Sequence, residues 1–187
     1  MRNFNISVDI DGVCLDTVGK IEAWGGPRRD RWKTWEGAEL NVYEKQALSD
    51  CFRARHFWRG GFELVPGAKD ALWELDALGV EIEYVTTPSV VMHGEVELFP
   101  NSAGRLADAG FPHPERVAHQ ADKTRLRTIA VVDDRPATIQ KILAYRREKG
   151  YPTQHVYQFH AQGYAEDGLK WAQILQRIKG ALNEQRE

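Results

Sequence analysis

Two aspartates separated by one residue stand near the N-terminus, directly after a strand-like segment. Residues 4–8, FNISV, alternate apolar and polar side chains, which is the period-two pattern of a β-strand. Asp9 and Asp11 follow at the point where this strand should end. An Asp-Gly turn would explain Asp11 and Gly12 alone, whereas a chemical role would let one carboxylate attack and the other move a proton.

Other polar side chains follow later strand-like segments. The segment VEIEYVTT ends in Thr86 and Thr87, and TIAVVDDRP places Asp133 and Asp134 after a strand apolar enough to be buried on both faces. Lys123 precedes that second segment. Because ligands of open α/β sheets bind beyond the carboxyl ends of the strands, we expect these groups to converge with the first aspartate pair.

Such a convergence would crowd three or four carboxylates into a small space. Crowded carboxylates repel one another and raise one another's pKa unless a cation lies among them. A set of ligands made only of oxygen atoms suits Mg²⁺, which usually keeps several waters and binds through one or two carboxylates together with a substrate phosphate. The acids therefore predict a Mg²⁺ site.

The remaining polar groups at this edge suit a phosphate. The hydroxyls of Thr86 and Thr87 and the ammonium of Lys123 would donate hydrogen bonds to phosphate oxygens, and Gly12 would let the backbone turn close to them. A carboxylate nucleophile would form an aspartyl-phosphate and so divide transfer to water into two displacements. The implied substrate is a small-molecule phosphate ester.

Helical patterns separate the strand-like segments. Strands are also expected in RVAH and TQHVYQF, and Pro88 is expected to end the strand that carries the two threonines. Alternation of strands with helices predicts an α/β protein with a Rossmann-like core, a mainly parallel sheet and helices on both faces. The predicted helices are PGAKDALWELDALG, NSAGRLADAGF, ATIQKILAYRREKG and a closing helix over residues 165–182.

Residues 14–62 differ from the rest in composition and are interpreted as a small helical cap inserted after the first strand. They contain Trp24, Trp32, Trp35 and Trp58, a GGPRRDR loop and a helical segment over residues 40–55. The tryptophans would either form the core of this layer or present flat surfaces to a ligand. Residues 1–13 and 63–187 would then form the catalytic core.

Composition restricts the functional classes. A formal net charge of −2 at pH 7 argues against a general basic surface for duplex nucleic acid. Two cysteines are too few for a disulfide framework, and neither a signal peptide nor a membrane span is recognisable, so we expect a soluble cytoplasmic protein that binds no membrane. Whether the chain forms a homodimer is left open.

The motifs, in this order, resemble those of phosphatases of the haloacid dehalogenase (HAD) superfamily. DIDGV is similar to the first motif, the threonine of VTT to the second, the lysine of DKT to the third and VVDDRP to the fourth. The resemblance implies Asp9 as nucleophile and Asp11 as general acid and then general base. It also implies Mg²⁺ bound by Asp9, the backbone carbonyl of Asp11 and an acid of the Asp133-Asp134 pair.

Within this superfamily the chain most resembles the 5'(3')-deoxyribonucleotidases. The similarity lies in DIDGV, in FW followed by ELVPGAKDAL, and in VTTPS, DKT and VVDDRP. It implies a nucleoside monophosphate substrate whose base stacks on aromatic side chains of the cap, each contact contributing about 1 to 3 kcal/mol. Phe57 and Trp58 match the family's aromatic pair, and Trp35 is a further candidate.

Two other functions fit the same residues. VVDDR also resembles the phosphatase domains of polynucleotide kinases, which would make the 3'-phosphate at a nucleic-acid end the substrate. A nucleotide-binding module that has the fold without turnover is the third reading. The lack of a basic stripe argues against the nucleic-acid end, and the complete set of catalytic side chains argues against the inactive module.

Overall fold

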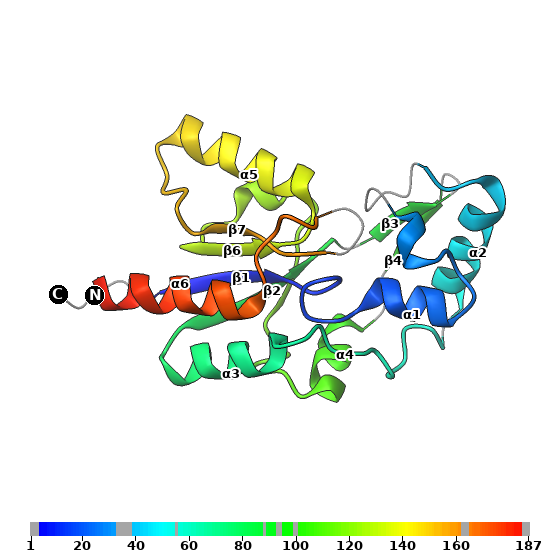
Figure 1. Ribbon diagram of the computed structural model, residues 1–187, viewed down its shortest axis with the longest axis horizontal. Helices are drawn as coiled ribbons and strands as arrows, with labels where there is room; N and C mark the ends of the chain where they lie inside the picture. Colours follow the sequence, from blue (N-terminus) through cyan, green and yellow to red (C-terminus); the bar gives the residue numbers. More distant parts are fainter. Residues whose placement is uncertain are drawn as a thin grey trace.

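The centre of the protein is a parallel β-sheet of five strands, seen in a computed structural model (Figure 1). The strand order is β5-β2-β1-β6-β7. The strands are β1 (Asn5–Asp9), β2 (Glu81–Thr86), β5 (Val117–His119), β6 (Ala130–Asp133) and β7 (Val156–Gln158). The structure describes residues 4–32, 39–54, 56–87, 89–92, 95–98, 101–161 and 165–184.

Helices flank this sheet, as the alternating pattern predicts. In Figure 1, α5 lies on one side and α3 and α6 on the other, with the strands between them. No helix in these ranges is long and apolar enough to cross a membrane. The four helices of the core are α3 (Ala68–Ala77), α4 (Ser102–Ala109), α5 (Pro136–Lys149) and α6 (Trp171–Glu184).

Local sequence signals set the ends of these helices. Pro136 begins α5, where a missing backbone N–H costs nothing, and Gly150 ends it in the left-handed conformation with φ of 68°. At α4, the Asn101 side chain accepts a hydrogen bond from the backbone N–H of Gly104 over 3.0 Å. These caps fix where each helix starts and stops relative to the strand ends.

The central strand β1 is buried on both faces, which a simple period-two pattern does not predict. Its apolar residues Ile6 and Val8 are fully buried, but Ser7 is buried as well. The Ser7 hydroxyl lies 2.7 Å from the hydroxyl of Thr128 and 3.3 Å from the carboxylate of Glu83. The polar side of the strand is therefore satisfied by hydrogen bonds rather than by water.

The strand order changes direction beside β1. The chain passes from β1 to β2 and β5 on one side, then returns to β6 and β7 on the other. Register pairs Val8 with Val132 and Asp9 with Val85, so the carboxyl ends of β1, β2 and β6 lie level with one another. This is the switch point at which α/β sheets bind ligands.

The segment after β1 has a hydrophobic cluster of its own. This segment contains α1 (Thr17–Ala23), the short 3₁₀-helix η1 (Arg29–Arg31) and α2 (Val42–Arg53). Figure 1 shows α1 and α2 at one end of the sheet. Cys14 and Leu15 still pack in the main core. The division into a cap over residues 14–62 and a core stays a prediction. The separate cluster consists of Val18, Ile21, Trp32, Leu40, Leu48, Cys51, Phe52, Phe57 and Trp58.

A second sheet follows β2 and was not predicted. It is an antiparallel hairpin of β3 (Ser89–Met92) and β4 (Glu95–Leu98). Strands of four residues are too short for a clear alternation, and a proline such as that at position 88 predicts the end of a strand. Pro88 itself lies outside the described residues.

The closing helix starts later than the predicted range of 165–182. It begins at Trp171, because Ala165 bridges to Ala161 and Leu169 to Phe159, so residues 165–169 form a turn rather than the first turns of the helix. Composition alone does not reveal such a bridge, since alanine is a good helix former.

The packing of α6 on the core gives a direct test of the fold. Ile174 is fully buried in the main cluster, so Ile174→Ala should lower the free energy of unfolding by about 2 to 5 kcal/mol. Gln176→Ala, at an exposed position of the same helix, should change it by less than about 0.5 kcal/mol. Urea unfolding followed by circular dichroism measures both, and equal effects of the two changes would contradict this packing.

Candidate active site

Asp9 stands at the last position of β1, where the chain enters a tight loop. The backbone N–H groups of Cys14 and Leu15 both donate to the carbonyl of Ile10, over 2.9 and 3.0 Å. Gly12 adopts φ of 83°, a conformation that other residues rarely take. The loop therefore folds back on the strand end and keeps Asp9 and Asp11 near each other.

Lys123 joins the ends of β1 and β6. Its ammonium nitrogen lies 2.8 Å from Oδ1 of Asp9 and 2.7 Å from Oδ2 of Asp133, and all three side chains are buried. The lysine begins the short 3₁₀-helix η2 (Lys123–Arg125), which is capped by the Asp122 side chain. The sequence predicts that this lysine lies close to the strand ends, and the structure places it between Asp9 and Asp133.

The charges in this cluster change one another's pKa. Burial raises the pKa of Asp9 to about 7, because the lowering effect of Lys123 offsets only part of the burial and the Asp133 charge adds to it. Burial alone would lower the pKa of Lys123, but Asp9 and Asp133 raise it above its usual value. The lysine therefore stays charged, while the Asp9 side chain near neutral pH is partly carboxylate and partly carboxylic acid.

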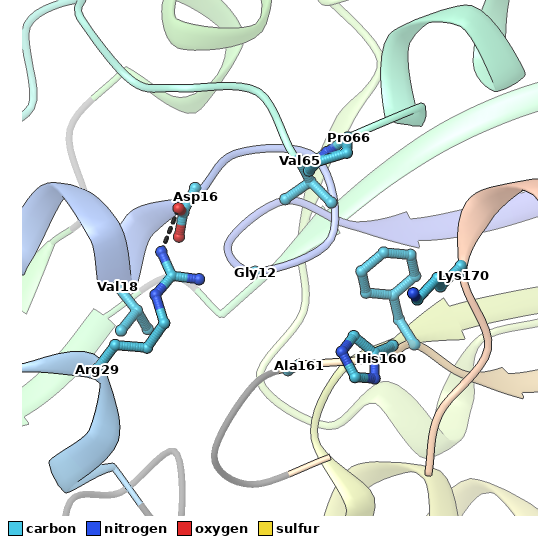
Figure 2. A pocket seen from close by; sticks show the side chains of 10 residues that line it. Gly12, Asp16, Val18, Arg29, Val65, Pro66, His160, Ala161 and Lys170 are labelled. Carbon is cyan, nitrogen blue, oxygen red and sulfur yellow. Dashed lines mark hydrogen bonds and ion pairs between the residues drawn. The ribbon is translucent and has the colours of Figure 1, made fainter. Parts of the chain in front are cut away.

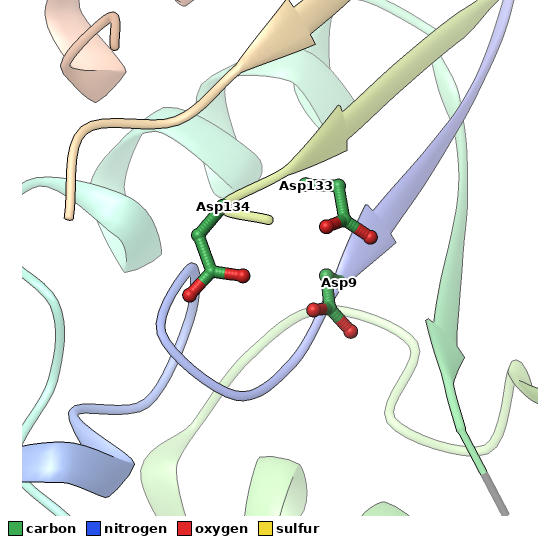
Figure 3. A group of neighbouring side chains, drawn as sticks. All are labelled: Asp9, Asp133 and Asp134. Carbon is green, nitrogen blue, oxygen red and sulfur yellow. The ribbon is translucent and has the colours of Figure 1, made fainter. Parts of the chain in front are cut away.

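Three carboxylates could hold a metal ion. One oxygen from each of Asp9, Asp133 and Asp134 lies within 4.8 Å of the others, and all three residues are buried. Figure 3 shows the Asp9 side chain at the end of one strand and those of Asp133 and Asp134 at the end of its neighbour. A donor set made only of oxygen fits a hard divalent cation.

Asp11 has different partners from Asp9. Its Oδ1 accepts hydrogen bonds from the hydroxyl of Thr17 over 2.6 Å and from the guanidinium of Arg105 over 2.9 Å. Burial raises the pKa of Asp11, but the charge and hydrogen bond of Arg105 and the hydrogen bond of Thr17 overcome this effect, and the pKa falls below its usual value. The two aspartates of DIDGV therefore sit in opposite electrostatic environments.

Sequence reasoning missed Arg105, as it missed Thr17, the other residue that bonds Asp11. The Arg105 side chain is only 1% exposed, and the sequence shows it only as one position of the predicted helix NSAGRLADAGF. The available signal was its position: Ser102, Arg105 and Leu106 share the buried face of α4. Because arginine is almost never fully buried without a partner, an arginine on an apolar helix face indicates a buried anion nearby.

Four buried carboxylates, from Asp9, Asp11, Asp133 and Asp134, lie at the same edge as two buried cations, Lys123 and Arg105. A divalent cation bound among Asp9, Asp133 and Asp134 would lower the repulsion between these acids.

The two threonines predicted to bind phosphate lie at the end of β2. Thr86 is buried one residue beyond Val85, the register partner of Asp9, whereas Thr87 is partly exposed. Thr87 and Lys123 line a cavity of about 280 Å³ that also contains Lys141. The structure thus brings both threonines to the same edge as the acids.

A second cavity, of about 310 Å³, lies beside the loop that carries Gly12. Figure 2 shows it between the inserted segment, represented by the ion pair of Asp16 and Arg29, and the residues His160 and Lys170 that follow β7. Its walls combine apolar groups with Lys170 and with the paired charges of Asp16 and Arg29, so it could take a small ligand.

The aromatic pair of the inserted segment is packed inside its own cluster. Phe57 is fully buried and Trp58 is 5% exposed. The Trp58 ring stacks on Phe52, with centroids 5.4 Å apart and planes at 17°. Contact with a base would require these rings to move, and a role in substrate binding stays a prediction. Trp35, the third candidate, lies outside the described residues.

Comparison with solved structures identifies the fold. A protein from Burkholderia xenovorans, assigned as a haloacid dehalogenase-like hydrolase, aligns with a TM-score of 0.51 and 13% identity over 97% of this chain and 99% of its own. One from Thermotoga maritima, assigned as a β-phosphoglucomutase, aligns with 0.50 and 15% over 95% and 99%. The HAD domain of the Legionella pneumophila effector Lem4, as an inactive mutant, aligns with 0.50 and 12% over 98% of both.

These likenesses show that the chain has the fold of the HAD-like hydrolases. At such low identity they establish the fold alone. No protein-family model matches the sequence, and no curated protein matches it.

The acid cluster predicts pH-dependent metal binding. Because a proton on Asp9 competes with a cation and its pKa is about 7 without metal, the apparent affinity for Mg²⁺ should rise with pH. Between pH 6 and pH 8 the apparent Kd should fall by about tenfold. The shift in Tm on titration with MgCl₂ measures this.

Two variants serve as controls for this measurement. Asp134→Asn should weaken the Mg²⁺-dependent shift in Tm at both pH values, since it removes one of the three carboxylates that could hold the ion. Asp108→Asn, at an exposed position of α4, should leave the shift unchanged. An affinity that does not vary between pH 6 and pH 8 would contradict the assignment of Asp9 to the metal site.

Proposed function

We propose that the protein is a Mg²⁺-dependent phosphomonoesterase that works through an aspartyl-phosphate on Asp9. The observation that carries the proposal is the position of Asp9 at the end of the central strand. There it contacts Lys123, lies beside Asp133 and Asp134, and precedes Asp11 by two residues. The fold of the HAD-like hydrolases is compatible with this chemistry.

In the first step, an Asp9 carboxylate oxygen attacks phosphorus and the bond to the leaving-group oxygen breaks. Asp11 gives a proton to that oxygen, so the leaving group departs as an alcohol. In the second step, Asp11 takes a proton from water as the water oxygen attacks phosphorus. Inorganic phosphate is released and the Asp9 carboxylate is restored.

The site would need a cation to bring a phosphate dianion next to these acids. Asp9 and the Asp133-Asp134 pair would hold Mg²⁺, which when bound supplies positive charge that stabilises the phosphoryl oxygens. Lys123 forms ion pairs with Asp9 and Asp133, which hold the Asp9 side chain in position, and its ammonium adds a second positive charge to the site. Thr86 and Thr87 would donate hydrogen bonds to the remaining oxygens.

The pKa of Asp11 fits its two tasks at different stages. In the free protein Arg105 lowers this pKa, which favours the carboxylate that acts as base in the second step. A phosphate dianion bound beside Asp11 would raise its pKa towards the protonated form that the first step uses. The same group can therefore act as acid and as base in one cycle.

Release of phosphate tests the reaction directly. The purified protein should hydrolyse phosphate monoesters with MgCl₂ and lose this activity in EDTA. Asp9→Asn should lower kcat by about 10³-fold or more, because it removes the nucleophile. A phosphate-release assay with Asp108→Asn as control measures these effects, and activity that persists in EDTA would contradict the mechanism.

We further propose that the substrates are nucleoside monophosphates and that deoxyribonucleotides are hydrolysed with the highest kcat/KM. The support is the similarity of the motifs to those of 5'(3')-deoxyribonucleotidases and the aromatic cluster of the inserted segment. Phe57 and Trp58 would reach a base only after the segment opens, since their rings are now packed against each other, with centroids 4.8 Å apart.

A substrate panel tests the specificity. Among 5'- and 3'-mononucleotides, ribo and deoxyribo, and a 3'-phosphorylated oligonucleotide, kcat/KM should be highest for a deoxynucleoside monophosphate. Trp58→Ala should lower kcat/KM for nucleotides by about 5- to 150-fold, the equivalent of one stacked base, and affect 4-nitrophenyl phosphate less. Trp73→Ala, at an exposed position of α3, is the control.

Two outcomes of this panel would favour the other functions. Preference for the oligonucleotide would make the protein a 3'-phosphatase of nucleic-acid ends. Binding of nucleotides without release of phosphate from any ester would make it a non-catalytic module.

A further inference from the structure

Arg105 is a buried cation that ties α4 to Asp11. A guanidinium taken out of water destabilises a protein by several kcal/mol unless an anion and hydrogen bonds compensate. Among the described residues, Asp11 is the one carboxylate that Arg105 contacts, at 2.9 Å. The hydrogen bond that its guanidinium donates to the Ser102 hydroxyl is long at 3.4 Å. Among these residues, Asp11 is therefore the anion that compensates the buried charge of Arg105.

Aromatic rings fix the position of this guanidinium. Its central carbon lies 5.2 Å from the ring centre of Trp58 and 5.1 Å from that of Phe62. Cation–π contacts of this kind restrict the plane in which the arginine can donate. The side chain is thus held from the inserted segment as well as from its own helix.

The hydrogen bonds to Asp11 leave one of its oxygens for chemistry. Thr17 and Arg105 both donate to Oδ1, over 2.6 and 2.9 Å. Within the described parts of the chain, no residue donates to Oδ2. A carboxylate clamped at one oxygen can rotate little, so Oδ2 has a defined direction.

We propose that Arg105 is a positioning residue that holds Asp11 so that Oδ2 faces the oxygen of the leaving group. This inference rests on the proposed phosphomonoesterase reaction. It adds to that proposal an explanation of how Asp11 is oriented towards the leaving group. Arg105 itself exchanges no proton in this role. It differs from a phosphate-binding arginine, which would act on every phosphate ester alike.

Leaving groups of different basicity separate these two roles. 4-Nitrophenolate departs without a proton, whereas the alkoxide of glycerol 2-phosphate needs one. The first turnover should be measured by rapid quench, so that hydrolysis of the aspartyl-phosphate does not enter the rate. Both esters present the same phosphoryl group to Asp9.

Arg105→Met should slow the first turnover of glycerol 2-phosphate by about 100-fold or more, the typical contribution of a general acid. The same variant should slow 4-nitrophenyl phosphate by less than about threefold, because the acid is not needed there. The ratio of the two rates is independent of how much of the protein is folded. Arg116→Gln, at an exposed arginine, should leave both rates unchanged.

A double variant with Asp11 sharpens the test. If Arg105 acts through Asp11, adding Arg105→Met to Asp11→Asn should change the rate with glycerol 2-phosphate by less than about twofold. Losses that multiply, or an equal loss with both esters in Arg105→Met, would overturn the positioning role and favour direct contact with phosphate.

The proposed function and the positioning role of Arg105 are contradicted by different results. Wild-type protein that hydrolyses neither ester would overturn the proposed function, and this inference with it. Active wild-type protein whose Arg105→Met variant keeps the rate ratio would overturn the inference alone.

Discussion

The contact of the Lys123 ammonium with Asp9 and Asp133 is the interaction on which the site depends. Parallel strands bring their carboxyl ends to one edge, and here this edge collects acids that would repel one another. A buried lysine within 2.8 Å of both carboxylates lets β1 and β6 lie side by side with these acids at their ends. Removing one partner would leave the others as uncompensated buried charges and would destabilise the protein.

The sheet order determines which groups this lysine can join. Because β1 is central and the chain reverses direction beside it, Asp9 has β2 on one side and β6 on the other. Thr86 and Asp133 reach the site from these neighbours, while the tight loop at Gly12 returns Asp11 to the same edge. Strand register sets the spacing of Asp9, Thr86 and Asp133. Lys123 and Asp11 lie outside the paired strands and are held at this edge by side-chain contacts.

Much of this arrangement could be predicted from the sequence, and the exceptions have physical causes. Alternating strand and helix patterns predict the parallel sheet. The positions of Asp9 and Asp133 at strand ends, with Lys123 shortly before the second of these strands, predict that the three meet. Arg105 could not be assigned in this way, because its role depends on the tertiary approach of α4 to Asp11. The same limit applies to Trp58: its sequence context suggests a platform for a base, but packing against Phe52 places it in a core. Local patterns reveal which face of a helix is buried, but not what it is buried against.

The inserted segment is coupled to the chemistry through the same aromatic cluster. Thr17, at the first position of α1, bonds Asp11 directly, and Trp58 and Phe62 fix the arginine that bonds it from the other side. Any movement of this segment that freed the rings for a ligand would also change the hold on Asp11. In the proposed reaction, substrate binding by this segment and orientation of Asp11 would therefore depend on the same contacts. A ligand that rearranges the aromatic cluster would act on the rate of the chemical step as well as on affinity, which is how binding energy distant from the reacting atoms contributes to catalysis.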